Sequence, residues 1–590
     1  MRSLKIIPIV SVFALLAGCA KSTDTTVSTA ASEPAYPSVQ VVTWSDFHSS
    51  IYEAKTDDGK ALGGLPVFMA AVEKLRGDGL SLVLDAGDMF QGAMPFNEAK
   101  GMGMIEMMNE LHIDAATFGN HEFDYGAGVK YPDSARGALR EAVEASKFPW
   151  VNANVVSTVE NDDSWSFKNM SPYVILQKGP YRIAVVGVLA IETPIATIAA
   201  NVEGLEFKPV AAALTEVIPK VVAENPDFIV VEAHVTGTPE PLPEDGNVPM
   251  TNANITEEIA EIAALPEDIK KHIGLVLAGH SHKSFIVFDG DLTIVENYSA
   301  GREITTMTLV GDDKGLHLDR SSIKKHELRH DRIDAACGEE PKPLAEMQVG
   351  DLTLVPSQKG RDLVTKYEGL MTNNRCEVVG CMADYVARNY EGECPLGNLV
   401  SDATRAYFSD ADIALVNAGG VRIDVPKGDI YRETLNSLMP FDNYLYLVDM
   451  TGEDVLRALK VSSTGKHGAT KVSGIHYAFE PNCSNPQDIN GDGQVEDWEN
   501  NCLCDGVTVN GKPLKVKSHY KVAVSDFMFK GGDSHAGVFE HSSVINEGPI
   551  MKNAILDYVK NQSACFTPEG LSPKDAPRIE ARSCGGKFSK

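Results

Sequence analysis

One loop in the first half of the chain reads Gly119-Asn120-His121-Glu122-Phe123-Asp124. An amide, an imidazole and two carboxylates stand within six positions, beside a glycine that lets the backbone approach a ligand closely. A single group of this kind is more often structural than functional. What it indicates therefore depends on the loops around it.

Four other loops carry the same residue types. They are Asp46-Phe47-His48, Gly87-Asp88-Met89-Phe90-Gln91-Gly92, the loop with His234, and Gly279-His280-Ser281-His282. The loops follow short apolar, β-branched runs such as Val39–Thr43, Leu82–Leu84, Phe228–Val231 and Leu275–Leu277. In α/β proteins such strand-end loops gather the chemistry. Five of them in succession predict one metal-binding site.

The residue types suit phosphate ester hydrolysis. That reaction needs a hydroxide at neutral pH and neutralisation of a developing dianion, and two metals about 3.5–4 Å apart supply both. A carboxylate can bridge two metals through its two oxygens, and Asp88 is the candidate. Imidazole and carboxylate ligands suit zinc, manganese or iron better than calcium, and we favour zinc or manganese.

These motifs resemble those of the calcineurin-like metallophosphoesterases. More closely, they resemble the 5′-nucleotidase family, which includes bacterial periplasmic UDP-sugar hydrolases and animal ecto-5′-nucleotidases. The resemblance covers nearly the whole chain. It implies an α/β fold with an N-terminal four-layer β-sandwich flanked by helices, plus a C-terminal α+β substrate-binding domain.

The resemblance also implies site residues. One metal would take Asp46, His48, Asp88 and His282, and the other Asp88, Asn120, His234 and His280. His121 would donate to the phosphoryl oxygen in the transition state. Asp124 would keep that imidazole oriented and charged.

The second half carries matching motifs at 396–403, 417–422, 440–441 and 527–533. The resemblance assigns Phe441 and Phe527 to a sandwich around the nucleobase, Asn417 to the base, Arg422 to the phosphate and Asp533 to the ribose hydroxyls. Stacking on two aromatic faces gives breadth rather than base specificity. Family members often have a second arginine where this chain has Tyr390, so phosphate recognition is expected to differ.

A calcium loop is predicted from Asp488 to Glu499. Asp488, Asn490 and Asp492 stand at the first, third and fifth positions of an EF-hand pattern, Gln494 would offer its carbonyl, and Glu499 would bind through two oxygens. The alternative is a solvated acidic turn. Because no long helices flank the loop, we expect a structural clip rather than a regulatory pair.

The N-terminus has the pattern of an export signal. Arg2 and Lys5 precede an apolar run that ends in Leu16-Ala17-Gly18-Cys19, which resembles the lipobox of bacterial lipoproteins. We predict a signal in residues 1–19, lipidation of Cys19, and a flexible tether at 20–37. The protein would be anchored at the periplasmic face or the cell surface. The alternative is an ordinary export signal with an incidental cysteine.

The rest of the 590-residue chain is expected to form a metallophosphoesterase domain at 38–330, a connection at 331–374 and a substrate domain at 375–590. The connection lacks strand signals, and 358–371 is the expected helix. Nine cysteines beyond Cys19 all lie in the second half, so at least one is unpaired within the chain. The net charge of −29 argues against a nucleic-acid polymer as partner.

The expected activity is removal of phosphate from nucleotides, with broad specificity and a role in nucleotide catabolism. A UDP-sugar or dinucleotide pyrophosphatase, or a 2′,3′-cyclic-nucleotide phosphodiesterase, could use the same metal ligands. A third interpretation is that the protein is not an enzyme but a catalytically silent surface-binding lipoprotein. The complete ligand set argues against it. The oligomeric state does not follow from the sequence.

Overall fold

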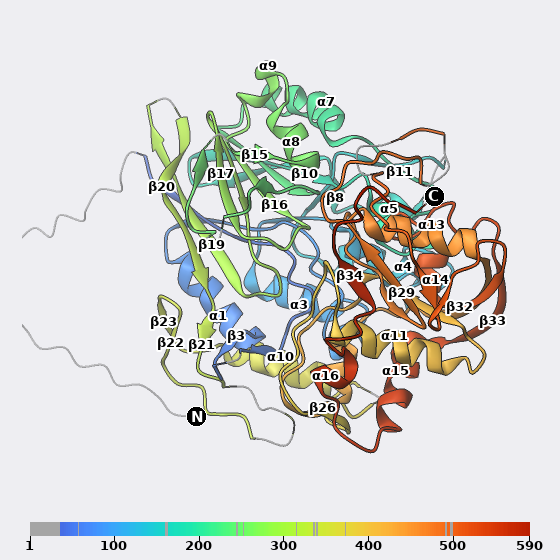
Figure 1. The fold of residues 1–590 in the computed structure, drawn as a ribbon. Coiled ribbons are helices and arrows are strands. Elements are labelled where there is room, and N and C mark those ends of the chain that lie inside the picture. Colours follow the sequence, from blue (N-terminus) through green and yellow to red (C-terminus); the bar gives the residue numbers. More distant parts are fainter. Residues whose placement is uncertain are drawn as a thin grey trace, which may run out of the picture.

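The computed structural model describes residues 36–589, apart from 57, 160–162, 244–245, 252, 314, 334–336, 338–339, 372, 490–492 and 496–498. The expected signal segment with Cys19, most of the tether, and the calcium-loop residues Asn490 and Asp492 lie outside the described residues. Figure 1 shows the first half of the chain on one side and the second half on the other.

The first half is built on two facing sheets. One runs in the order β20 (Gly315–Glu327), β19 (Glu303–Asp312), β1 (Val39–Trp44), β4 (Leu80–Asp85), β5 (Ala115–Thr117), β6 (Trp150–Val151), β8 (Met170–Ser171). The other runs β14 (Met250–Thr251), β17 (Phe285–Asp289), β18 (Leu292–Glu296), β16 (Leu275–Gly279), β12 (Phe228–His234), β10 (Tyr181–Leu189), β9 (Tyr173–Lys178). Strands β1, β4 and β5 are parallel, as are β10, β12 and β16.

Alternating side chains of these strands build a four-layer sandwich. In β4, Leu82 and Leu84 face the second sheet, while Val83 faces the helices outside. The outer layer on the first sheet contains α1 (Leu65–Arg76), α3 (Met102–Leu111) and α4 (Gly137–Ala145). The outer layer on the second sheet contains α7 (Val210–Ala223), α8 (Glu257–Ala263) and α9 (Glu267–Lys270). The predicted sandwich flanked by helices is confirmed (Figure 1).

The second half is an α+β domain, as predicted. Its main sheet runs β28 (Lys471–Ser473), β25 (Ile413–Val416), β32 (His519–Ser525), β27 (Tyr444–Thr451), β33 (Ser543–Ile550). On one face lie α11 (Pro395–Tyr407), α12 (Arg432–Leu438) and α15 (Met551–Lys560). On the other lie α13 (Gly452–Ser463) and a small sheet that includes β29 (Ile475–Phe479).

The connecting segment differs from the expectation in one respect. The expected helix forms as α10 (Gln358–Glu368), three residues shorter at its C-terminus. The segment was predicted to lack strands, but β22 (Met347–Val349) and β23 (Leu352–Leu354) form a hairpin. Strands of three residues are too short to show alternation in the sequence. The hairpin joins a sheet with β21 (Arg329–His330), and α10 packs on α1, so most of the connection belongs to the first domain.

Disulfides join Cys337 to Cys376, Cys381 to Cys565, Cys483 to Cys502, and Cys504 to Cys584. Among the described cysteines, Cys394 alone is free, and it is buried. The first disulfide ties the connection to the start of the second domain. None of the helices within residues 36–589 has the length and apolar character required to cross a bilayer.

Candidate metal centre and substrate cavity

The carboxyl ends of β1, β4, β5, β12 and β16 bring the predicted ligands to one place. Left-handed backbone conformations occur at Asp46 (φ 52°), Asp88 (φ 56°) and His280 (φ 88°), although none is glycine. Such strain in non-glycine residues clusters at functional sites. Gly119 permits the close approach: a β-carbon there would lie 2.1 Å from Asp88 Oδ1.

One group of donors consists of Asp46, His48, Asp88 and His282, whose candidate ligand atoms lie within 4.8 Å of one another. His48 Nε2 is 2.9 Å from His282 Nε2, and His282 Nε2 is 3.4 Å from Asp46 Oδ1. The other nitrogen of His48 lies 3.1 Å from the Phe90 carbonyl. Because that carbonyl can only accept, Nδ1 carries the hydrogen and Nε2 turns its lone pair to the group.

A second group consists of Asp88, His234 and His280. His234 Nδ1 donates to the Ala86 carbonyl at 2.9 Å, and its Nε2 lies 3.2 Å from Asp88 Oδ2. The His234 side chain is fully buried, and its Nε2 lacks a hydrogen-bond partner among the described residues. Asn120 Oδ1 lies 2.9 Å from His280 Nδ1 and so joins this group.

The charges of the two groups fit cations. Burial alone would lower the pKa of His234, but the Asp88 and Asp46 carboxylates outweigh it and raise the pKa to about 10. Burial opposes ionisation of Asp88 too, yet the surrounding histidines hold its pKa well below the ordinary value. The two aspartates thus stay ionised and stabilise positive charge at this site, which a metal ion would carry in place of a proton on the imidazoles. A convergent set of nitrogen and oxygen donors with an orphaned imidazole nitrogen is what transition-metal ions require.

His121 and Asp124 lie beside the donor groups, with the His121 ring centroid 5.1 Å from that of His48. His121 Nδ1 is 2.6 Å from Asp124 Oδ2, and Thr197 and Gln91 donate to the same carboxylate. Burial works against protonation of His121, but Asp124 and Asp88 outweigh it and raise its pKa. The imidazole stacks on the Phe441 ring, with centroids 5.5 Å apart.

Glu122 is a residue of this loop to which the sequence analysis gave no role. Its buried carboxylate accepts hydrogen bonds from the backbone N–H groups of Asp88, Met89, Phe90 and Gly119. It therefore ties the loop after β4 to the loop after β5. Its position inside the motif was the one feature of the sequence that could have indicated a role. Its hydrogen-bond partners can be identified only from the folded structure.

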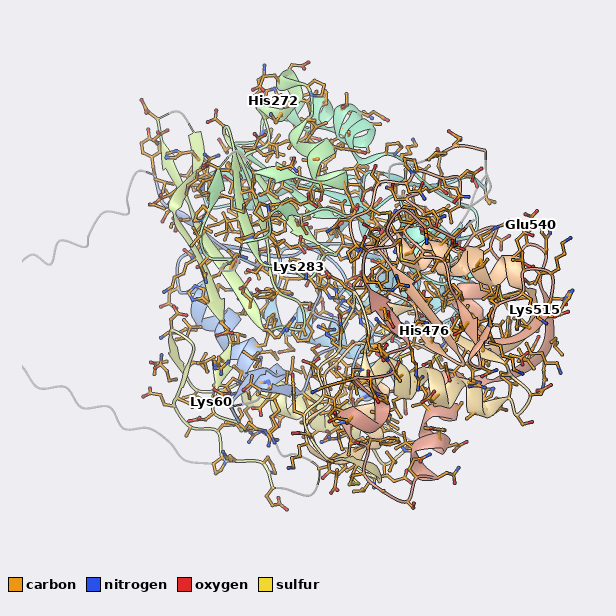
Figure 2. The ribbon with its side chains drawn as sticks, viewed as in Figure 1. Lys60, His272, Lys283, His476, Lys515 and Glu540 are labelled. Carbon is orange, nitrogen blue, oxygen red and sulfur yellow. A yellow bond between two sulfur atoms is a disulfide. The ribbon has the colours of Figure 1, made fainter. Side chains whose placement is uncertain are left out.

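A cavity of about 670 Å³ lies between the two domains, and members of both groups line it, namely Asp88, His280 and His282. All five predicted substrate residues line it: Asn417, Arg422, Phe441, Phe527 and Asp533. Figure 2 shows Lys283, another lining residue, near the middle of the molecule between the two domains.

Arg422 reaches furthest towards the donor groups. Its Nη2 lies 3.3 Å from His48 Nε2, and its guanidinium lies 5.7 Å from the Phe441 ring centroid. Phe527 packs against Gly532, where a β-carbon would lie 2.5 Å from the ring. Burial raises the pKa of Asp533 to about 7. Tyr390 and Arg388 also line the cavity, and Arg388 donates to the Arg422 carbonyl.

The calcium loop is described in part. Gly493 has φ 87° and donates its N–H to Asp488 Oδ2 at 3.0 Å. Glu499 is fully buried and accepts from the Ile489 N–H at 2.8 Å. The Cys483–Cys502 disulfide brackets the loop. The predicted ligands Asn490 and Asp492 lie outside the described residues, so the calcium site stays a prediction.

Two family models match this chain. The calcineurin-like phosphoesterase model matches residues 40–284, and the 5′-nucleotidase C-terminal domain model matches residues 376–541. A cell wall protein of Listeria monocytogenes is 24% identical, with 89% of this chain and 67% of that protein covered. A trifunctional nucleotide phosphoesterase of Bacillus subtilis is 26% identical, with 85% of this chain but 32% of that protein covered.

A solved structure has the same fold over almost the whole chain. It is a 5′-nucleotidase precursor from Thermus thermophilus, with a TM-score of 0.71 and 21% identity. The match covers 92% of this chain and 99% of that one.

Proposed function

Because the chain belongs to the two-domain 5′-nucleotidase family of calcineurin-like, metal-dependent phosphoester hydrolases, we propose that it removes phosphate from nucleotides outside the cytoplasm. One observation carries the proposal. Two metal-donor groups that share Asp88 face Arg422 and Asp533 of the other domain across a single cavity. Phosphate chemistry and nucleotide recognition therefore meet in one place.

The donors fit two transition-metal ions, zinc or manganese by ligand chemistry. Asp46, His48, Asp88 and His282 would hold one, and Asp88, Asn120, His234 and His280 the other. When bound, such a pair lowers the pKa of water and neutralises charge on the phosphoryl group. The orphaned nitrogen of His234 supports this assignment.

The chain's own residues would act on the phosphoryl group around the metals. We assign to His121 a hydrogen bond to the phosphoryl oxygen, whose charge grows in the transition state. Asp124 holds the proton on the other ring nitrogen and so keeps the imidazole cationic. Arg422, which faces His48, is placed to receive two phosphate oxygens with its planar fork.

The second domain would bind the nucleoside. Phe441 and Phe527 present rings to the cavity for the base, with Asn417 at its edge, and Asp533 would accept from the ribose hydroxyls. Stacking tolerates any base, so we expect breadth rather than preference for one nucleotide. The neutral Tyr390 in the place of a second arginine leaves fewer positive charges for a polyphosphate.

The competing activities differ in the bond that is cleaved. A pyrophosphatase would release a nucleoside monophosphate from UDP-glucose or NAD, and a cyclic phosphodiesterase would open a 2′,3′-cyclic nucleotide. A silent binding protein would release nothing. The decisive assay presents AMP, ATP, UDP-glucose, NAD and a 2′,3′-cyclic nucleotide to the protein with zinc or manganese. We expect inorganic phosphate from AMP, abolished by chelator. If AMP stays intact while another member of the panel is cleaved, the nucleotidase assignment is wrong.

Two further assignments complete the proposal. We infer that the protein is exported and anchored through Cys19, on the lipobox-like run at 16–19. A related cell wall protein supports export. We also infer a calcium ion at 488–499, supported by the buried Glu499 carboxylate and the left-handed Gly493.

A further inference from the structure

Glu192 is a cavity residue to which neither the motifs nor the proposed chemistry assign a role. It follows β10 and immediately precedes α5 (Thr193–Ala196) in the first domain. Its Oε1 lies 3.5 Å from His280 Nε2, and its Oε2 lies 3.1 Å from Lys466 Nζ. One carboxylate therefore contacts a metal-ligand candidate and a cation of the other domain at the same time.

The geometry of His280 shows what the first contact does. Its Nδ1 faces Asn120 Oδ1 at 2.9 Å, so this nitrogen points to the second donor group. Its Nε2 points to Glu192. An imidazole that binds a metal through one nitrogen carries its hydrogen on the other, and a carboxylate that accepts this hydrogen fixes the ring orientation and strengthens the ligand.

Two of the other ligand imidazoles are oriented differently. His48 and His234 each direct Nδ1 to a backbone carbonyl of the first domain, at 3.1 and 2.9 Å. Their orientation is built into the loops. His280 instead faces a side chain, which can move, and that side chain is held by a residue of the second domain.

The loop that carries Lys466 lies between α13 and β28 and also touches the proposed ribose site. His467 Nε2 lies 2.8 Å from Ser534 Oγ, and its Nδ1 lies 4.0 Å from Asp533 Oδ1. The Asp533 N–H donates to the Ile195 carbonyl, three residues beyond Glu192. The contacts therefore run continuously from His280 through Glu192 and Lys466 to the substrate residues of the second domain.

We propose that Glu192 is a positioning residue that orients His280 and links it, through Lys466, to closure of the two domains. The inference rests on the proposed role of His280 as a metal ligand. The pair is partly buried, with 15% of the Glu192 side chain and 21% of the Lys466 side chain exposed, so water screens it less than a surface ion pair. The second metal is then held best when the domains are together.

The first test is a calorimetric titration of the metal-free, full-length protein with Mn²⁺, without nucleotide. We expect wild type to bind two ions. In Glu192→Gln one ion should bind as in wild type and the other about 10–100-fold more weakly, the usual effect of losing such a support. Glu240→Gln, an exposed cavity residue of the same charge, is the matched control and should titrate as wild type. Wild-type affinity for both ions in Glu192→Gln would overturn the positioning role.

The second test examines the contact between Lys466 and Glu192 separately from the contact between Glu192 and His280. At saturating Mn²⁺, Lys466→Met should keep both ions but lose at least about tenfold in kcat/KM on the best substrate of the panel. Lys466→Arg, which keeps the charge, should recover most of it. If Lys466→Met turns over as wild type, the link fails. Failure of the wild type itself to bind a second ion would instead contradict the two-metal function, so the two failures are distinguishable.

Discussion

At the scale of single residues, Asp88 has the most demanding position. Its Oδ1 accepts the His121 N–H at 2.8 Å, its Oδ2 lies 3.2 Å from His234 Nε2, and its backbone is left-handed. Because it belongs to both donor groups, Asp88→Asn should weaken both metals together. The measurement is metal content after dialysis against a weak chelator. Asp85→Asn, at a buried carboxylate that ends β4 and lies outside both groups, should retain its metals.

His121 should behave in the opposite way. It lies beside the metal donors without belonging to either group, so His121→Ala should leave metal content unchanged. Its kcat should fall by about 10²–10⁴-fold, the usual scale for an acid or a charge-stabilising group. Steady-state kinetics and metal analysis on the same preparation check this. A variant that loses metal would show His121 to be a ligand.

At the scale of elements, α2 (Met94–Glu98) and α12 meet across the domain interface. Glu433 in α12 is buried, its Oε1 lies 3.4 Å from the Met94 N–H and 3.0 Å from Ser437 Oγ, and its Oε2 lacks a partner among the described residues. Burial raises the pKa of Glu433 to about 7. The folded protein therefore holds this proton at pH values where the unfolded chain has released it.

The sign of the pH effect follows. Between the ordinary carboxyl pKa and about 7, the folded state binds more protons than the unfolded state, so this group makes the free energy of unfolding fall as pH rises. Because glutamine does not ionise, Glu433→Gln removes this decrease in the free energy of unfolding. The variant should gain on the order of 1–3 kcal/mol relative to wild type between pH 5 and pH 8. Denaturant unfolding at both pH values measures it, with Glu540→Gln on the exposed outer edge as control (Figure 2).

The calcium loop is a second element with its own test. Ion binding to the folded form alone raises stability by mass action. Calcium should raise the melting temperature of wild type, and Asp488→Ala combined with Glu499→Gln should abolish the rise. Activity with the transition metals supplied should survive, because none of the loop residues that the structure describes lines the cavity. If calcium leaves the melting temperature of wild type unchanged, the segment is an acidic turn.

At the scale of the whole molecule, the substrate cavity exists only where two domains meet. The connection between the domains packs on the core of the first domain through Leu363 and Tyr367 of α10. The Cys337–Cys376 disulfide links the connection covalently to the start of the second domain. The connection is therefore attached to the first domain as far as α10, and a short stretch after α10 leads to the second domain.

Attachment to a membrane is also a property of the whole molecule. Each buried methylene of an acyl chain contributes about 0.8 kcal/mol to membrane binding, and none of the described helices is long and apolar enough to cross a membrane. Cys19→Ser should therefore move the protein from the membrane fraction to the soluble fraction, with kcat unchanged. Fractionation followed by an activity assay decides this. Retention in the membrane fraction would point to another anchor.

The strand-end pattern of the sequence indicated one metal-binding site, and the family resemblance implied the four-layer architecture and the division of the donors between two metals. Ligand types and strand periodicity are local properties: Asp46 and His48 stand next to their strand, and parallel strands deliver their carboxyl ends to one edge. The family resemblance added the substrate residues, and all of them line the cavity. Short strands such as β22 were missed because three residues carry no readable period.

Only the tertiary structure decided what joins these parts. Glu122 is one acidic residue among 82 Asp and Glu in the sequence, and its four backbone partners become visible only when two loops pack together. The disulfide pairing, and the choice of Cys394 as the free thiol, depend on distances between segments far apart in the chain. The same holds for Glu192 and Lys466, which lie in different domains. A local pattern identifies donors of a metal site, but the contacts that orient them are set by three-dimensional packing.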